Sequence, residues 1–180
     1  RVYVSRVRYA QPPNLSEDDS VISDIGGREN NEDCLLYIDN KDGSGMYAVM
    51  DGAGGHEGGE KASAFVANFL ITNECKISSF CLLNKENPQV LYKYLEELMS
   101  KIHMLMSQES FYRDASFNAK PLSTLSLVVK LDSKSYVYKS IGDSPILKYS
   151  AETDSTELLV TPQIVQAFVS DDSLDLQSYD

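Results

Sequence analysis

The sequence predicts one α+β domain built from mainly antiparallel sheets. Segments with strand character come first, two amphipathic helical segments follow, and short strands joined by tight turns return after them. A chain of 180 residues suits a single domain with its own hydrophobic core. The pattern lacks the regular alternation of strand and helix that builds a parallel sheet, so we expect helices packed on antiparallel strands.

Four strands are predicted before Asp51, at residues 2–9, 20–25, 34–38 and 46–50. Residues 40–43 separate the last two strands and read Asn-Lys-Asp-Gly, which is typical of a hairpin turn. Residues 46–50 are apolar throughout, which predicts a strand buried on both faces.

Two helices are predicted next. From residue 59 to about residue 72, apolar side chains recur every three or four positions and form one stripe. The second helix begins at Asn87 and Pro88, because asparagine can cap a helix and proline suits its first position. Its leucine and isoleucine residues repeat at helical intervals as far as Leu105. Residues 109–121 are expected to be a loop.

The remaining strands are predicted to be short, at residues 124–131, 135–141, 146–149 and 157–160. Residues 132–134 form the turn of a hairpin between the first two of them. The tail beyond Ser170 is acidic and is expected to be exposed, and it contains Asp171, Asp172, Asp175 and Asp180.

Composition excludes several classes of partner. The chain has 27 acidic and 16 basic residues, and its net charge of −11 disfavours nucleic acid and anionic membranes as partners. Its apolar stretches are shorter than the ~20 residues that a membrane-spanning helix needs. The chain opens without a leader pattern, and Cys34, Cys75 and Cys81 sit among apolar residues as reduced, buried thiols do. We therefore expect a cytoplasmic protein.

Three clusters contain residues suited to chemistry. In residues 28–33, three carboxylates and Arg28 precede a strand, which suits a hard divalent cation beside a phosphate, although a solvated charged turn has the same composition. Asp51 ends an apolar strand and is followed by five glycines within residues 52–59, a density that indicates tight turns or a close approach to the backbone. Asp143 also ends a strand, where Gly-Asp-Ser-Pro equally suits an ordinary turn.

Taken together, these clusters resemble the PP2C family of metal-dependent protein serine/threonine phosphatases, and its bacterial-style branch more than the animal one. The resemblance rests on residues 23–33, residues 47–56, Ser123-Thr124 and residues 141–144, and it covers about residues 20–170. It implies a β-sandwich flanked by helices in αββα layers. It also implies two or three Mn²⁺ or Mg²⁺ ions, a phosphorylated protein as substrate and a metal-bridging water that attacks phosphorus.

The resemblance also implies roles for individual residues. Asp51 matches the residue that bridges two metals, while Glu32 and the carbonyl of Gly52 match ligands of the second metal. Asp33 matches a residue that orients the water, and Arg28 matches the residue that holds phosphate. Asp143 matches a ligand of a third metal.

Several positions depart from the family pattern. Ala53 stands where many relatives have histidine, Leu122 replaces a glycine, and Pro145 replaces an arginine. The family's later aspartates have no match in context, so we expect an incomplete metal centre and a domain that is incomplete at its carboxyl end.

The expected organisation is an N-terminal strand and loop at 1–19, a partial phosphatase domain at 20–170 and an acidic tail at 171–180. The chain alone is then inactive or incomplete as an enzyme. A pseudophosphatase that binds a signalling partner without turnover remains the alternative, and an unrelated acidic interaction domain is a third reading.

Overall fold

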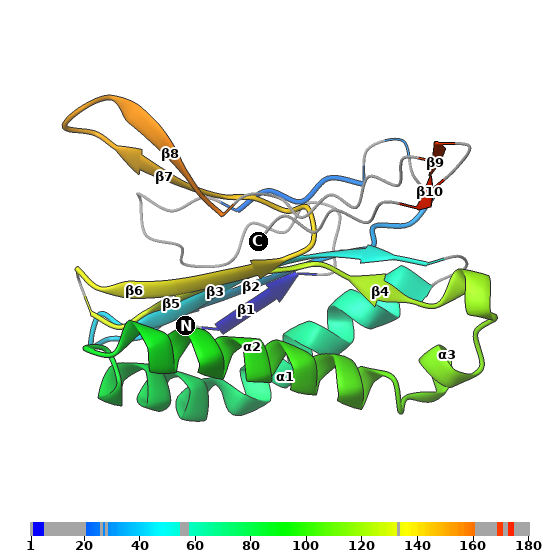
Figure 1. The fold of residues 1–180 in the computed structure, drawn as a ribbon. Coiled ribbons are helices and arrows are strands. Elements are labelled where there is room, and N and C mark those ends of the chain that lie inside the picture. The colour runs from blue at the N-terminus through cyan, green and yellow to red at the C-terminus, as the bar shows by residue number, and fades with distance from the viewer. Residues whose placement is uncertain are drawn as a thin grey trace.

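The computed structural model describes residues 2–5, 21–25, 27, 29–54, 58–132, 134–160, 169–170 and 173–174. Its described part is an antiparallel sheet with two long helices on one face and a separate hairpin on the other side (Figure 1). This arrangement confirms the predicted α+β class with antiparallel sheets and flanking helices.

The main sheet has the strand order β1-β2-β3-β5-β6, and β4 also pairs with β3. These strands are β1 (Val2–Ser5), β2 (Asp33–Asp39), β3 (Gly45–Ala53), β4 (Leu122–Ser123), β5 (Leu125–Lys130) and β6 (Tyr136–Ile141). The strands β7 (Ile146–Ser150) and β8 (Ser155–Val160) form a second, two-stranded sheet, and β9 (Val169–Ser170) pairs with β10 (Ser173–Leu174).

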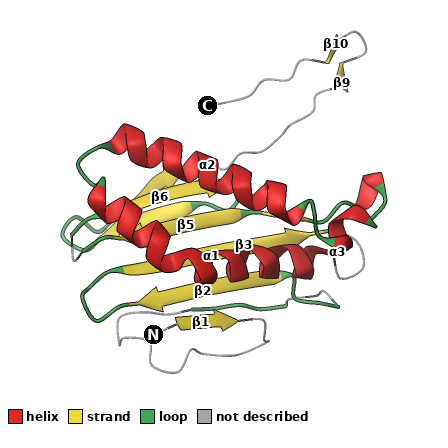
Figure 2. Cartoon of the chain, turned by 90° about the horizontal axis from the view of Figure 1, so that it is seen from below, coloured by secondary structure: helices red, strands yellow, loops and turns green. Residues whose placement is uncertain are grey.

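Two helices cover one face of the main sheet, α1 (Gly58–Leu83) and α2 (Pro88–Met106) (Figure 2). The short helix α3 (Ser110–Arg113) and a 3₁₀ turn at Phe117–Ala119 follow α2, so the predicted loop at 109–121 contains two short helical turns. None of the described helices is both long and apolar enough to cross a membrane.

The core lies between this helical layer and the sheet. Met46, Met50, Leu70, Leu95 and Leu127 are almost completely buried there. The predicted cap of α2 is confirmed, because the Asn87 side chain accepts a hydrogen bond from the backbone N–H of Val90.

Two predicted strands differ from the structure. Residues 21–25 form no strand, and Ile22 among them is 85% exposed, so this short apolar pattern has no partner strand among the described residues. In β3, burial alternates instead of covering both faces, and Val49 is 44% exposed on the face away from the helices. The prediction failed there because an apolar run does not distinguish one buried face from two.

Helix α1 extends to Leu83, well beyond the predicted end near residue 72. Its additional turns bury Ile77 and Cys81 in the core that α1 shares with α2, so tertiary packing extends the helix past residues with weak helical propensity. Cys34 is buried as expected, but Cys75 is exposed, which corrects the expectation that all three thiols are buried.

Candidate functional site

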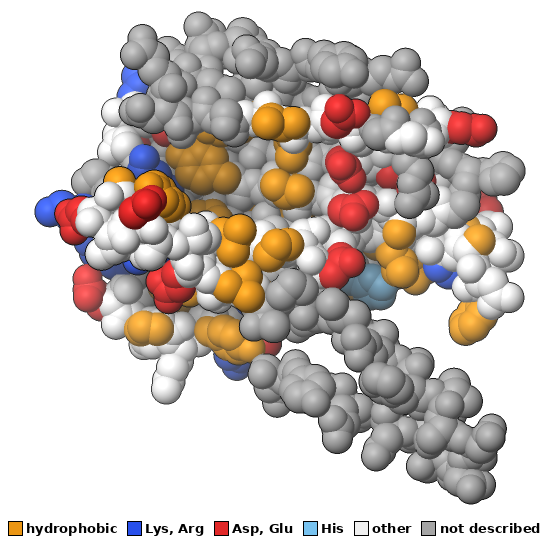
Figure 3. Space-filling view, turned by 90° about the horizontal axis from the view of Figure 1, so that it is seen from above, with side chains coloured by type: hydrophobic (Ala, Val, Ile, Leu, Met, Phe, Trp, Pro, Cys, Tyr) orange, Lys and Arg blue, Asp and Glu red, His pale blue; other side chains and the backbone are white. Residues whose placement is uncertain are grey.

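The site begins with a pair of aspartates on neighbouring strands. Asp33 opens β2 and lies directly opposite Asp51 of β3 in the antiparallel ladder. Opposed residues point to the same face of a sheet, and burial alternates along β3 so that Met50 and Gly52 are buried while Asp51 is exposed. Both carboxylates therefore lie on the face away from the helices, where Figure 3 shows acidic side chains gathered in a row.

The pKa of Asp33 is raised above its ordinary value. Desolvation by burial is the largest cause, followed by the negative charge of Asp51, hydrogen bonding to Asp51 and the charge of Glu32. Two carboxylates at one point resist ionising together unless a cation lies between them. This electrostatic arrangement favours a bound cation.

Glu32 is held next to Gly52 by the backbone. The N–H of Gly52 donates to the Glu32 carbonyl at 3.2 Å, and the hydroxyl of Ser63 on α1 donates to the same carbonyl at 2.6 Å. A Cβ added at Gly59 would lie 2.8 Å from Oε1 of Glu32, so this carboxylate rests against the start of α1. The structure thus brings Glu32, Asp33, Asp51 and Gly52 together. Ser63 was missed because a serine inside an amphipathic helix gives no signal in the sequence.

Asp143 follows β6 in a turn connected to the same strands. Gly142 has φ +98°, and a Cβ there would lie 2.7 Å from Cγ2 of Thr124, so the turn requires glycine. Thr124 in turn pairs with Asp51: its N–H donates to the Asp51 carbonyl, and its Oγ1 accepts from the Asp51 N–H, each at 2.9 Å. Asp143 itself is exposed.

One predicted site residue, Arg28, lies outside the described residues. Within the described ranges, no group of three or more histidine, cysteine or acidic side chains is arranged to hold a metal ion. The described part of the site is therefore a carboxylate pair with Glu32 beside it, and not a complete metal shell.

The residues present fit a hard divalent cation in chemical type. Carboxylate and carbonyl oxygens are the donors that Mg²⁺ and Mn²⁺ prefer. The raised pKa of Asp33, caused by burial and by the neighbouring carboxylates, is what an acidic pair shows without a counter-charge. Among the described residues, Asp33 and Asp51 are the carboxylates that could share such an ion, and Glu32 and the carbonyl of Gly52 lie beside them.

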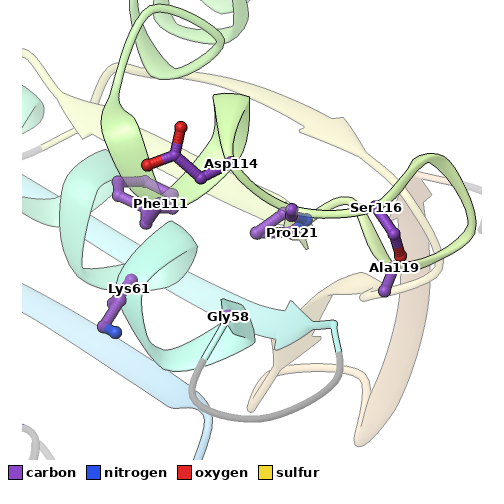
Figure 4. A pocket seen from close by; sticks show the side chains of 8 residues that line it. Gly58, Lys61, Phe111, Asp114, Ser116, Ala119 and Pro121 are labelled. Atoms are coloured by element: carbon purple, nitrogen blue, oxygen red, sulfur yellow. The ribbon is translucent and has the colours of Figure 1, made fainter.

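A groove of about 470 Å³ lies beside the first turn of α1. Figure 4 shows Phe111 and Asp114, which follow α2, above Lys61 of α1, and Pro121 to one side of all three. A Cβ added at Gly58 would lie 3.1 Å from Cγ of Pro121, so the glycine allows the two segments to approach closely. The groove contains none of the predicted metal ligands and is separate from the acidic pair.

Comparison with solved structures identifies the fold. The chain is similar to a bacterial serine phosphatase carrying an arginine-to-glutamate mutation, with TM-score 0.58, 19% identity and coverage of 79% of this chain and 60% of that one. It is also similar to the serine/threonine phosphatase Stp1 from Staphylococcus aureus, with TM-score 0.56, 17% identity and coverage of 86% and 58%. The chain thus spans about 60% of the length of these phosphatases. No curated protein sequence matches it.

The family model for protein phosphatase 2C matches residues 23–168, which is most of the chain. The fold is accordingly that of the phosphatases above, and the chain belongs to the protein phosphatase 2C family. The resemblance inferred from the acidic and glycine-rich clusters is confirmed.

Proposed function

We propose that this chain carries part of a metal-dependent site that hydrolyses phosphoserine and phosphothreonine in proteins. The observation that carries the proposal is the opposed pair Asp33 and Asp51, in a chain of the protein phosphatase 2C family. On this proposal, residues 20–170 are the phosphatase part of the chain and a phosphorylated protein is its substrate.

Each site residue has a proposed task. Asp51, Glu32 and the carbonyl of Gly52 would hold two cations, and Asp143 would serve a third. When bound, Mn²⁺ or Mg²⁺ lowers the pKa of water and neutralises the phosphate. Asp33 accepts a hydrogen bond from the attacking water and so orients it towards phosphorus.

Phosphate binding is assigned to Arg28. An arginine presents a planar fork of N–H donors that matches two phosphate oxygens. Arg28 lies outside the described residues, so its role follows from its match to the family motif alone. An Arg28→Lys variant would keep the charge and lose the fork.

The test is phosphate release from a phosphothreonine peptide with and without Mn²⁺. Any phosphate that the chain releases should require Mn²⁺ and should no longer be released by Asp51→Asn. The matched control is Asp114→Asn, which also removes one exposed carboxylate but lies in the separate groove. Release that needs no metal, or that survives in Asp51→Asn, would contradict the proposal.

A binding module without turnover is the second candidate. The incomplete carboxylate shell of the described residues favours it, as does Ala53 in place of the histidine of many relatives. This candidate predicts Mn²⁺-dependent binding of the phosphopeptide, abolished by Asp51→Asn, with no phosphate released. Fluorescence anisotropy of a labelled peptide measures that binding directly.

A further inference from the structure

Four hydroxyl side chains join the two backbone segments that carry Asp51 and Asp143. They belong to Thr124, Ser126, Ser140 and Ser144, and we call them the hydroxyl clamp. Ser126 and Ser140 are a directly opposed pair on β5 and β6, and they are only 7% and 5% exposed. The clamp is thus a cluster of hydrogen-bonded hydroxyl groups, two of which are buried.

Thr124 forms the end of the clamp next to Asp51. Its Oγ1 accepts a hydrogen bond from the Asp51 N–H at 2.9 Å and lies 3.0 Å from Oγ of Ser144. Because the Thr124 N–H also donates to the Asp51 carbonyl, both backbone groups of Asp51 are held by one residue. Thr124 therefore connects Asp51 to the residue that directly follows Asp143.

The other end of the clamp holds the turn after β6. The carbonyl of Ser144 accepts from Oγ of Ser126 at 2.6 Å and from Oγ of Ser140 at 3.0 Å, and the two hydroxyl oxygens are 2.9 Å apart. These three contacts share two hydroxyl protons, so two hydrogen bonds form at one time. A carbonyl oxygen has two lone pairs and can accept both.

Because burying a hydroxyl group without a partner costs free energy, the hydroxyl clamp favours one conformation of the turn. An unpaired hydroxyl in a buried position loses its bonds to water, so each serine stabilises the one position of the turn in which its partner is present. Gly142, with φ +98° against Thr124, fixes the other side of the turn. Asp143 thus lies between Gly142, at a position where a side chain would not fit, and Ser144, whose carbonyl is hydrogen-bonded.

We propose that the hydroxyl clamp positions Asp51 and Asp143 as one unit. A change in the turn that contains Asp143 then alters the backbone hydrogen bonds of Asp51. Thr124, Ser126, Ser140 and Ser144 are then positioning residues for the acidic site. The coupling between the turn and Asp51 needs no bound metal. Its consequence for cation binding rests on the proposed function.

Amide hydrogen exchange measured by NMR in the metal-free chain tests the coupling. Ser140→Ala removes a donor on β6, a strand that pairs with β5 and not with β3. The Asp51 amide should then exchange about fivefold faster, the effect of weakening one hydrogen bond. The control Ser135→Ala removes a hydroxyl at the other end of the same hairpin and should leave Asp51 unchanged. Core amides such as that of Leu127 report any global loss of stability.

Ser144→Ala keeps the carbonyl in the clamp and removes only the contact to Thr124. In this background, Ser140→Ala should no longer change exchange at Asp51, because the connection is already broken. If the two substitutions act additively, or if Ser140→Ala leaves Asp51 unaffected, the coupling is wrong.

Mn²⁺ binding measured by calorimetry separates this inference from the proposed function. Ser144→Ala should weaken binding about tenfold, as substitutions behind metal ligands do, while Ser135→Ala should not. Unchanged affinity in Ser144→Ala would overturn the positioning role. If the unaltered chain binds no Mn²⁺, the proposed function and the metal consequence fail together, and the exchange data alone decide the coupling.

Discussion

Asp33 lies directly opposite Asp51 across the β2–β3 ladder, which places two carboxylates side by side on the face of the sheet away from the helices. Like charges on opposed residues destabilise a pair of strands. The pKa of Asp33 is raised by burial first and by Asp51 second, so ionising Asp33 costs the folded protein free energy. The stability of the metal-free chain should therefore depend on pH in a defined direction.

A raised folded-state pKa favours folding at low pH. The contribution is fully present below the ordinary aspartate pKa of ~3.9 and is lost as pH rises through the raised value. Asp33→Asn prevents the loss of stability that occurs when Asp33 ionises, so it should raise the melting temperature in EDTA at pH 7. The difference in melting temperature between the variant and the unaltered chain should disappear near pH 4. Asp114→Asn controls for the loss of one negative charge. An unchanged or lower melting temperature in Asp33→Asn at pH 7 would contradict the electrostatic argument.

Strand β3 lies so close to the start of α1 that an alanine side chain at Gly59 should destabilise the protein. A Cβ there would lie 2.7 Å from the carbonyl carbon of Gly52 and 2.8 Å from Oε1 of Glu32. Alanine is favoured in helices by up to about 1 kcal/mol, but overpacking against backbone costs about 1–3 kcal/mol. We expect Gly59→Ala to lower the free energy of unfolding in urea, whereas Gly27→Ala, with nothing within 4 Å, should not.

The second half of α1 should contribute to stability as strongly as the first. Ile77 is 1% exposed in the core, while its neighbour Lys76 is exposed. Ile77→Ala should reduce the free energy of unfolding by about 2–5 kcal/mol, and Lys76→Ala should change it by less than about 0.5 kcal/mol. Equal effects of the two substitutions would show that α1 does not pack beyond residue 72.

The three thiols should react at different rates in the native chain. Cys75 is exposed, but its pKa is raised by a hydrogen bond to Glu74 and by the charge of that carboxylate. Burial raises the pKa of Cys81 to about 11. Iodoacetamide at pH 8 should label Cys75 alone, and Glu74→Gln should accelerate that labelling because the thiolate becomes more populated. Mass spectrometry that finds rapid labelling of Cys81 before unfolding would contradict the buried position.

Local sequence signals predicted most of the elements. The Asp-Gly turn before Gly45 and the capped start of α2 at Asn87 depend on neighbouring residues, and both are found in the structure. The end of α1 and the one-sided burial of β3 depend on packing partners far away in the chain, which a local pattern does not contain.

The acidic residues of the site could be predicted from the sequence, but most of their contacts could not. The order of the acidic clusters indicated the family, but the opposition of Asp33 and Asp51 depends on the register of β2 and β3. The pair Ser126 and Ser140 could have been found by counting back from the turn at residues 132–134, which fixes the hairpin register. Ser63 contacts Glu32 through tertiary structure alone, so nothing local marked it.

The measurement that tests the central claim most directly is a calorimetric titration of Mn²⁺ into this chain and into Asp51→Asn. The acidic pair predicts that the chain binds Mn²⁺, that binding releases protons at pH values where Asp33 is still partly protonated, and that Asp51→Asn abolishes binding while Asp114→Asn leaves it unchanged. Equal Mn²⁺ affinity in the chain and in Asp51→Asn would contradict the assignment of this face as a metal site.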